Sequence, residues 1–367
     1  MSYLKRVEAR LAEIATAHRT RTVEPWQPRG VIDFSSNDYL ALATDPQVVA
    51  AFRQAKRVGA GGARLLGGRH REHSLLEEEL ALWLGRERAL IFSSGYLAAL
   101  GSIAVLGSVV ERIASDRLNH ASLIDGIRAT GLPRTIFPHA QPPPGDGTPT
   151  LYVSESLFSM DGDTIDPARM LVALGPDDVL LLDEAHALGV YGAEGAGLAY
   201  DLRDDRVVIL GTLSKALGAQ GGFIAGPARS IDLIANAARP FIFDTALPPS
   251  IALAARVALV LARKADDRRA HLRELAVRLR AGLQTHEIAS GGQAASPIVP
   301  ILIGDEEATL LTARLLLAKN IYAPAIRPPT VPRDTSRIRV SLRSDIRVED
   351  IDALLREVSR ATSVERL

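Results

Sequence analysis

Cysteine is absent from the 367 residues of the chain, and long apolar runs are absent as well. Without thiols the chain cannot form a disulfide scaffold, a cysteine nucleophile, a zinc–thiolate site or an iron–sulfur cluster. A membrane-spanning helix needs about 20 apolar residues, whereas the longest candidate, residues 97–110, is shorter and is interrupted by glycine and serine. The first ten residues carry charges throughout and contain no apolar signal core. We therefore expect a soluble, cytoplasmic protein with no membrane partner.

An excess of charge of either sign is also missing. Lys and Arg together number 43, as do Asp and Glu, so the formal net charge is zero and gives no bulk attraction to nucleic acid. The composition, 47% hydrophobic and 23% charged, is close to that of an average soluble globular protein, which excludes disorder, collagen and coiled coil as the main state. At roughly 100–200 residues per domain, the length allows two or three domains.

Apolar strand-like runs alternate with helical periodicity through the middle of the chain, which predicts an α/β fold with a mostly parallel sheet. The expected strands are residues 31–34, 90–92, 112–114, 135–137, 151–153, 179–182, 207–210 and 222–225. The expected helices are residues 3–17, 46–56 with Asp45 as N-cap, 74–84 with a capping box of Ser74 and Glu77, and one long helical stretch over 253–283.

The composition changes near Pro248 and Pro249, where we expect a domain boundary. A strand at 298–303, a helix at 306–318, a strand at 337–342 and a helix from 348 onward then predict a smaller α+β unit. The expected organisation is an N-terminal helix and segment over 1–38, a large domain over 39–247 and a small C-terminal domain over 248–367.

The sharpest local feature is the segment Leu181-Leu-Asp-Glu-Ala-His186, in which an apolar strand ends in an acid. Ligands of open α/β sheets bind at the carboxyl ends of strands, so Asp183 and His186 are expected at a ligand site. Lys215 follows the next expected strand, within Gly211-Thr-Leu-Ser-Lys-Ala-Leu-Gly218. Alone, the segment 181–186 is explained less well by a surface turn than by a ligand site, whereas Lys215 alone is explained better as a surface lysine. The pairing changes this balance, because two strand ends of one sheet can face one site.

A lysine amine paired with a carboxylate, in a chain without cysteine, suggests the Schiff-base chemistry of pyridoxal phosphate. That cofactor needs a lysine for its aldehyde, an acid that keeps the pyridine nitrogen protonated, and backbone N–H groups at a helix N-terminus for its phosphate. The segment Ser93-Ser-Gly-Tyr96, between an expected strand and an expected helix, fits the third requirement. Gly95 allows the backbone to approach the phosphate closely.

Together these motifs resemble the signature of the α-oxoamine synthases, which are fold-type-I pyridoxal-phosphate enzymes. The matching segments span nearly the whole chain: 34–40 (FSSNDYL), 93–96 (SSGY), 119–122 (NHAS), 158–162 (FSMDG), 183–186 (DEAH), 212–218 (TLSKALG), 238–243 (ARPFIF), and 325–332 (AIRPPTVP) ahead of 337–339. The resemblance implies a homodimer with shared active sites and an acyltransferase reaction. In the subgroup that 325–332 resembles, L-alanine condenses with pimeloyl-CoA, or with pimeloyl on a carrier protein, and loses carbon dioxide, in biotin biosynthesis.

The resemblance also implies residue roles. Lys215 would bond the cofactor covalently, with Asp183 on the pyridine nitrogen, His186 on the ring hydroxyl, His120 stacked on the ring and Ser159 beside it. The phosphate would be held by Gly95, Tyr96, Thr212 and, from the neighbouring subunit, Thr245. The substrates would meet Asn37, Thr330, Arg339 for the amino-acid carboxylate, and Arg19 or Arg21 for the acyl group. The expected catalytic residues are Lys215, His120, Asp183 and His186, and no metal is expected.

Three alternatives remain open at this point. One is another α-oxoamine synthase that joins glycine to acetyl-CoA, although the stretch 326–332 argues against it. A second is a catalytically silent partner subunit, which the joint presence of Lys215, Asp183 and His120 disfavours. A third is a dinucleotide-binding dehydrogenase, suggested by the glycine-rich loop 59–68, which lacks the required glycine spacing and follows a helix. His70, His73, His139 and His271 stand outside every motif and are expected to be structural.

Overall fold

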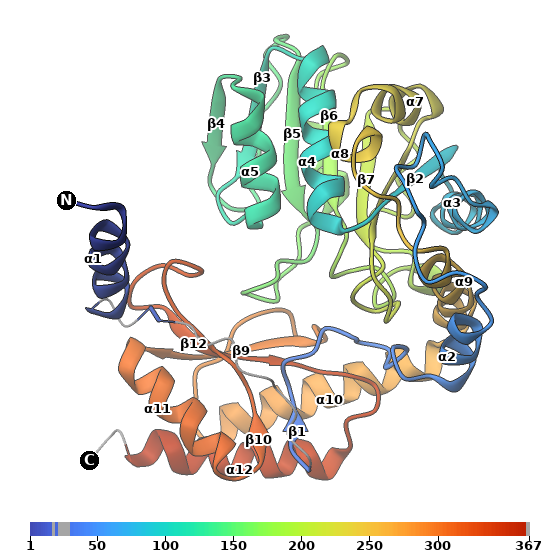
Figure 1. Cartoon of the computed structure of the whole chain (residues 1–367). Helices are drawn as coiled ribbons and strands as arrows, with labels where there is room; N and C mark the ends of the chain where they lie inside the picture. Colours follow the sequence, from blue (N-terminus) through green and yellow to red (C-terminus); the bar gives the residue numbers. More distant parts are fainter. Residues whose placement is uncertain (17–18, 21–29, 365–367) are drawn as a thin grey trace.

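A seven-stranded sheet forms the centre of the larger part of the molecule in the computed structural model, which describes residues 1–16, 19, 20 and 30–364 (Figure 1). Its strand order is β2-β8-β7-β6-β5-β3-β4. The strands are β2 (Arg88–Phe92), β3 (Arg112–Asp116), β4 (Arg134–Phe137), β5 (Thr150–Glu155), β6 (Val179–Asp183), β7 (Val207–Thr212) and β8 (Gly222–Gly226). Only β8 runs antiparallel to its neighbours, β2 and β7, and the prediction of a mostly parallel sheet is confirmed.

Helices cover both faces of this sheet. Successive side chains of its strands point to opposite faces, and the apolar side chains on each face pack with helices into a separate core. On one face, Val153 and Leu181 pack with α4 (Gly95–Leu106), α5 (Ala121–Thr130), α7 (Ala228–Ala237) and α8 (Arg239–Ile242). On the other, Tyr152 and Leu182 belong to a core with α3 (Arg71–Leu84), α6 (Pro167–Ala173) and α9 (Pro249–Arg263). Sheet strands buried on both faces explain why their sequences read as continuous apolar runs.

The smaller part contains a three-stranded antiparallel sheet of order β11-β12-β9. Its elements are β9 (Ile298–Gly304), β11 (Ala325–Ile326) and β12 (Ser336–Ser341), with α10 (Asp266–Thr285), α11 (Glu306–Leu317) and α12 (Val348–Val364) packed beside them (Figure 1). The N-terminal strand β1 (Ile32–Asp33) pairs in parallel with β10 (Ile321–Tyr322). The segment after β1, before α2 (Pro46–Arg53), therefore lies on the C-terminal part although it is far away in sequence.

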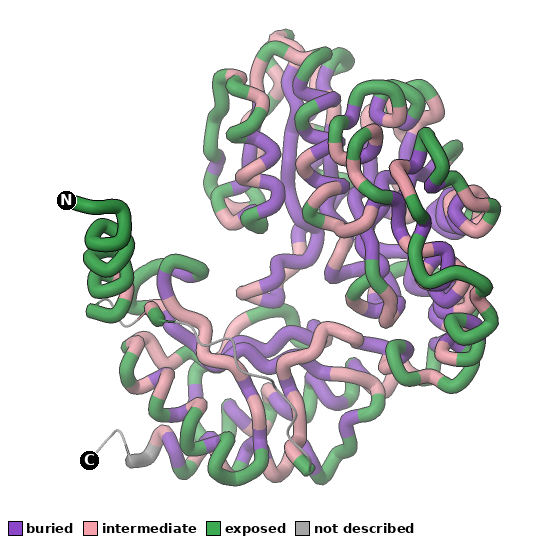
Figure 2. Tube along the Cα trace, in the orientation of Figure 1, coloured by how far each residue is buried: buried purple, intermediate pink, exposed green. Residues whose placement is uncertain are grey.

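The N-terminal helix α1 (Tyr3–Thr16) stands apart from both sheets. None of its residues is buried, and Leu4 and Leu11 on its apolar stripe are 67% and 60% exposed (Figure 2). An apolar stripe without cover is unusual for a stable surface helix. No helix in the described part of the chain is long and apolar enough to cross a bilayer.

Two local predictions are wrong. The helix expected at 74–84 begins at Arg71, and its start is capped by His70 and His73 rather than by a box of Ser74 and Glu77. The Glu77 carboxylate instead accepts hydrogen bonds from Ile91 N (3.1 Å) and from the Arg64 guanidinium (2.7 Å), because the burial of this side chain favours partners from other elements over its own helix end.

The long helical stretch expected over 253–283 is in fact two helices, α9 and α10, separated at Lys264 and Ala265. Arg269 stabilises the break. Its buried guanidinium donates to the carbonyls of Ala262 (2.6 Å) and Arg263 (3.1 Å), which have no partners within α9, and pairs with Asp266 at the start of α10 (2.7 Å). The boundary expected at Pro248 and Pro249 coincides with the start of α9, and the three-part division of the chain stays a prediction.

Candidate active site

The carboxyl ends of the parallel strands enclose a cavity of about 250 Å³. It lies where β5, β6 and β7 end and where α4 and α5 begin. Its lining consists of Ser94, Gly95, Tyr96, His120, Ser122, Glu155, Asp183, Ala185, His186, Leu210, Gly211, Thr212, Ser214 and Lys215. Every cofactor-binding residue expected from the sequence is in this set except Ser159 and Thr245. The strand-end argument therefore located one real cavity.

Two carboxylates lie side by side in it, because Asp183 and Glu155 are register partners on β6 and β5. One oxygen of Asp183 accepts the N–H of Ala185 at 2.8 Å. Glu155 is 2% exposed, and its Oε1 has no hydrogen-bond partner among the described residues. Burial raises the pKa of both acids, and the charge of Asp183 helps to hold the pKa of Glu155 well above its ordinary value. Burial therefore favours the protonated form of both acids, and more strongly for Glu155 than for Asp183.

Lys215 approaches the same cavity from the loop after β7. Burial lowers the pKa of its amine, opposed by the negative charges of Asp183 and Glu155. Among the described residues, no carboxylate lies within ion-pair distance of this amine. A desolvated amine without an ion-pair partner is neutral more often than an exposed lysine, and can act as nucleophile or base.

Two histidines, His120 and His186, line the cavity. His120 is the N-cap of α5, and its Nδ1 accepts the N–H of Ser122 at 3.2 Å. His186 is buried, with Nδ1 at 2.6 Å from the hydroxyl of Tyr39. Burial lowers the pKa of both imidazoles, and for His186 the nearby cations Lys215 and Arg339 lower it further. Both rings are thus neutral.

The N-terminus of α4 closes one end of the cavity. Ser94 is its N-cap, with Oγ accepting the N–H of Leu97 at 3.2 Å. A side chain at Gly95 would lie 3.3 Å from Thr212 Oγ1, which itself donates to Gly221 O at 2.9 Å. Free N–H groups in a first helical turn, beside a threonine hydroxyl, suit an anion such as a phosphate.

The arginine expected to bind the amino-acid carboxylate lies across from the sheet, on β12. Arg339 donates to Ser159 O (2.6 Å), to Ser341 Oγ (2.6 Å) and through two nitrogens to Asn37 Oδ1 (3.2 Å each). Arg337, two residues earlier on the same face of the strand, donates to Asp161 at 2.6 Å. Asn37, Ser159 and Arg339 therefore form one group beside the cavity, although none of them lines it.

Three other expected residues are not brought to the cavity of their own chain. Thr245 forms an isolated bridge with Ala63, and Thr330 is exposed in the loop between β11 and β12. Arg19 follows α1, its N–H bonded to Ile14 O at 2.9 Å. Arg21 lies outside the described residues.

Two residues at the site were not singled out by the sequence. Glu155 could have been found as the polar residue that ends an apolar strand, by the same reasoning that selected Asp183. Tyr39 lies in the matching segment 34–40, but only the fold brings it to His186, which is 147 positions away in sequence.

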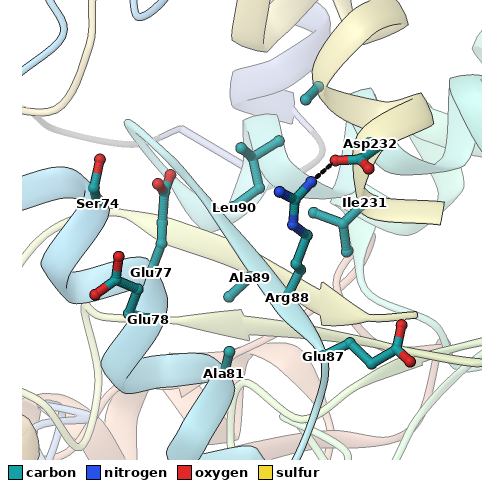
Figure 3. A pocket seen from close by; sticks show the side chains of 11 residues that line it. Ser74, Glu77, Glu78, Ala81, Glu87, Arg88, Ala89, Leu90, Ile231 and Asp232 are labelled. Carbon is teal, nitrogen blue, oxygen red and sulfur yellow. Dashed lines mark hydrogen bonds and ion pairs between the residues drawn. The ribbon is translucent and has the colours of Figure 1, made fainter. Parts of the chain in front are cut away.

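A second hollow of about 360 Å³ lies between α3, β2 and α7, and Figure 3 shows it lined by Glu77, Glu78, Glu87 and Asp232, with Arg88 paired to Asp232. It contains neither lysine nor histidine. No cluster of three or more His, Asp or Glu in the described residues could hold a metal ion. Of these two hollows, the first is the one that contains the lysine, the acid and the histidines expected at a cofactor site.

The first cavity fits pyridoxal phosphate on its own features. Within the described part of the chain it combines an amine without an ion-pair partner (Lys215), a carboxylate with one oxygen committed to the backbone (Asp183), and a helix N-terminus suited to an anion. The buried Oε1 of Glu155 has no partner among the residues that the structure describes, and an unpaired buried polar atom of this kind fits a ligand contact. The donor set matches the three requirements of the cofactor.

Comparison with known proteins gives a consistent picture. The sequence pattern of the aminotransferase class I and II family matches residues 29–358. The 8-amino-7-oxononanoate synthase of Burkholderia mallei (strain SAVP1) is 43% identical over 347 residues, covering 89% of this chain and 87% of that protein. The enzyme of the same name from Burkholderia pseudomallei (strain 1710b) is 42% identical over the same shares of both chains.

Solved structures resemble the whole chain. A serine palmitoyltransferase of Sphingomonas wittichii superposes with a TM-score of 0.90 at 27% identity, covering 99% of both chains. An 8-amino-7-oxononanoate synthase of Francisella tularensis superposes with a TM-score of 0.79 at 25% identity, covering 92% of this chain and 99% of that one. The fold-type-I architecture expected from the sequence is confirmed.

Proposed function

Because the chain belongs to the aminotransferase class I and II family, and within it to the 8-amino-7-oxononanoate synthases, we propose that it condenses L-alanine with a pimeloyl thioester in biotin biosynthesis. The products are 8-amino-7-oxononanoate, carbon dioxide and the free thiol carrier. The observation that carries the proposal is the meeting of Lys215, Asp183, His120 and His186 in one cavity at the N-terminus of α4.

Bound pyridoxal phosphate supplies an electron-accepting ring that stabilises negative charge on the α-carbon of the amino acid. The chain's own residues determine how that ring is used. With the cofactor bound, Asp183 would hold a proton on the pyridine nitrogen. The N–H groups of the first turn of α4 and the hydroxyl of Thr212 would hold the phosphate, and His120 and His186 would contact the ring.

Lys215 performs the proton transfers. Burial lowers the pKa of its amine, which increases the share of the neutral form that can bond the cofactor aldehyde. With L-alanine in place on the cofactor, the same amine would remove the proton from the α-carbon and return one to it at the end. The cofactor would supply the stabilisation of the α-carbon that lets the thioester acylate it, with release of the thiol and of carbon dioxide.

Arg339 and Asn37 bind the carboxylate of L-alanine. A guanidinium presents two parallel donors that match a carboxylate, and the burial of Arg339 strengthens this contact. Arg339 donates to Asn37, Ser341 and Ser159, so the substrate must replace at least one of these partners. Thr330 and Arg19 belong to the acyl-substrate side in this proposal.

The protein acts as a cytoplasmic homodimer with shared sites. Thr245 lies away from the cavity of its own chain, and the apolar stripe of α1 is uncovered, and both features support a second copy that completes the site. The acyl group comes as a thioester of CoA or of a carrier protein.

Incubation of the purified protein with pyridoxal phosphate, L-alanine and pimeloyl-CoA tests the proposal. Mass spectrometry should detect 8-amino-7-oxononanoate, and none with the Lys215→Ala variant. A preference for glycine with acetyl-CoA over this pair would contradict the substrate assignment while leaving the cofactor assignment in place.

A further inference from the structure

Tyr39 connects the two halves of the candidate site. Its backbone belongs with the C-terminal part, because Ser344 N donates to Tyr39 O at 2.9 Å and Ser341 N donates to Phe34 O at 2.7 Å. Its side chain is 0% exposed and reaches in the other direction, to His186 after β6. The Tyr39 hydroxyl oxygen lies 2.6 Å from His186 Nδ1 and 3.3 Å from Asn37 Oδ1. One hydroxyl thus touches a cavity histidine and a member of the Arg339 group.

The position of the single hydroxyl proton follows from its two neighbours. Asn37 Oδ1 already accepts two nitrogens of Arg339 (3.2 Å each) and the hydroxyl of Ser341 (3.1 Å). An amide oxygen has only two lone pairs, so it is fully occupied without Tyr39. His186 Nδ1 is nearer, and a neutral imidazole nitrogen without hydrogen is a good acceptor.

We propose that Tyr39 is a positioning residue that donates its hydroxyl proton to Nδ1 of His186, and so places the ring hydrogen of His186 on Nε2. Among the residues that the structure describes, none hydrogen-bonds to this Nε2, and the ring lines the cavity. The imidazole is therefore oriented as a hydrogen-bond donor toward the bound ligand.

Charge does not disturb this arrangement. Burial raises the pKa of Tyr39 to about 12, with the cation of Arg339 acting in the opposite direction. Burial, together with Lys215, Arg339 and His120, holds the pKa of His186 well below its ordinary value. These shifts favour the neutral form of both groups, and a neutral imidazole has two possible tautomers. The hydrogen bond from the Tyr39 hydroxyl favours the tautomer of His186 with hydrogen on Nε2.

The inference rests on the proposed function in one respect: the group that accepts the hydrogen of His186 Nε2 is the ring oxygen of the cofactor. It adds a physical link between two binding events. Tyr39 contacts Asn37, and Asn37 accepts from Arg339, so a substrate carboxylate that draws Arg339 away changes the environment of the hydroxyl that orients His186.

Nitrogen-15 NMR of the full-length chain, with its eight histidines labelled, distinguishes the two neutral tautomers without substrate or turnover. His186→Gln identifies the signal. We expect the wild type to show hydrogen on Nε2. In Tyr39→Phe the ratio of the two tautomers should fall by about tenfold, the amount set by one neutral hydrogen bond.

Tyr152→Phe is the matched control, because Tyr152 is equally buried and its hydroxyl donates to Pro143 O at 3.0 Å, away from His186. It should leave the His186 signal unchanged. With pyridoxal phosphate added, Tyr39→Phe should move the pH titration of the visible absorbance band upward by about one unit, because a donor to the ring oxygen is weakened.

A wild-type signal with hydrogen on Nδ1, or a Tyr39→Phe signal identical to wild type, overturns the inference. Failure of the proposed function would appear elsewhere, as absence of product from L-alanine and pimeloyl-CoA in the wild type. The wild-type tautomer can be read even if the variant does not fold, so the inference stays open to refutation.

Discussion

The two sides of the candidate site differ in how completely their polar groups are paired. At the strand ends of the seven-stranded sheet, Lys215 has no ion-pair partner and Glu155 has an oxygen without a hydrogen bond, as far as the described residues go. On β12 of the smaller sheet, the Arg339 guanidinium donates to three groups of the protein. The sheet side is therefore prepared for a resident ligand, whereas the β12 side must exchange partners when a substrate arrives. This difference in hydrogen bonding fits the proposed function, in which the cofactor stays bound and the substrate is exchanged in each turnover.

The largest effect is expected at Lys215. Lys215→Ala should lower kcat by more than about 10³-fold, because an amine that bonds the cofactor and moves the α-proton has no local substitute. Borohydride reduction followed by peptide mapping should label Lys215 alone among the five lysines of the chain. A label on Lys264, whose own alanine variant serves as the control, would show that the assignment is wrong.

Asp183→Asn keeps the size of the side chain and removes its charge. We expect kcat to fall by about 10²–10³-fold, because a preorganised charge that stabilises the reacting electrons is lost. The cofactor should still bind, more weakly, and a titration of the visible absorbance measures this. Turnover equal to wild type would mean that Asp183 does not face the ring nitrogen.

His139 connects the sheet side of the site with the β12 side. Its Nδ1 lies 3.1 Å from Asp116 at the end of β3, and its Nε2 lies 2.5 Å from Asp163. Asp163 belongs to the turn whose residues accept hydrogen bonds from both β12 arginines. Hydrogen bonds to Asp116 and Asp163 raise its pKa to about 10. The folded pKa is above the unfolded one, so the stabilisation is complete below about pH 6.5 and is lost as the pH rises through about 10.

His139→Gln leaves the buried Asp116 without its cation and should lower the free energy of unfolding by about 3 kcal/mol at pH 7. Denaturant unfolding of both proteins between pH 6 and 11 measures the difference, which should shrink toward the alkaline end. A difference that is constant over this range would show that His139 acts by packing alone.

Arg339→Ala should raise the dissociation constant of L-alanine by roughly 10- to 150-fold, the value of one charged hydrogen-bonded partner. The cofactor should still bind before substrate is added, because Arg339 does not line the cavity. Arg337→Ala is the matched control, since Arg337 pairs with Asp161 and should leave the affinity within about threefold. Coinciding titrations of wild type and Arg339→Ala would remove Arg339 from this role.

The smallest effect is expected from Glu155→Gln. Burial and the charge of Asp183 hold the pKa of Glu155 well above its ordinary value, which favours the protonated form, and glutamine reproduces the charge of that form. The pH profile of kcat/KM should shift by less than about half a unit. If the part of this pH profile that depends on the Lys215 amine moves to lower pH in the variant, Glu155 is charged in the wild type.

The strands and the carboxyl-end residues were open to prediction because they depend on local patterns. Continuous apolar runs indicate strands buried on both faces, and the topology of a parallel sheet brings Asp183, His186 and Lys215 to one edge. The same rule applies to Glu155, which was overlooked rather than hidden. Helix ends were less predictable, since the Glu77 carboxylate had several possible partners and the structure gave it Arg64 and Ile91 N.

By itself, then, the sequence determined the alternation of strands and helices, the edge of the sheet that carries the site, and the amine and acids placed there. The tertiary structure alone decided which distant segments complete it. Asn37 meets Arg339 across 302 positions, and Tyr39 meets His186 across 147, because β1 pairs with β10 and carries the N-terminal segment onto the C-terminal part. No periodicity along the chain encodes such pairs, since they arise from how separate elements pack and not from the local conformation of either segment.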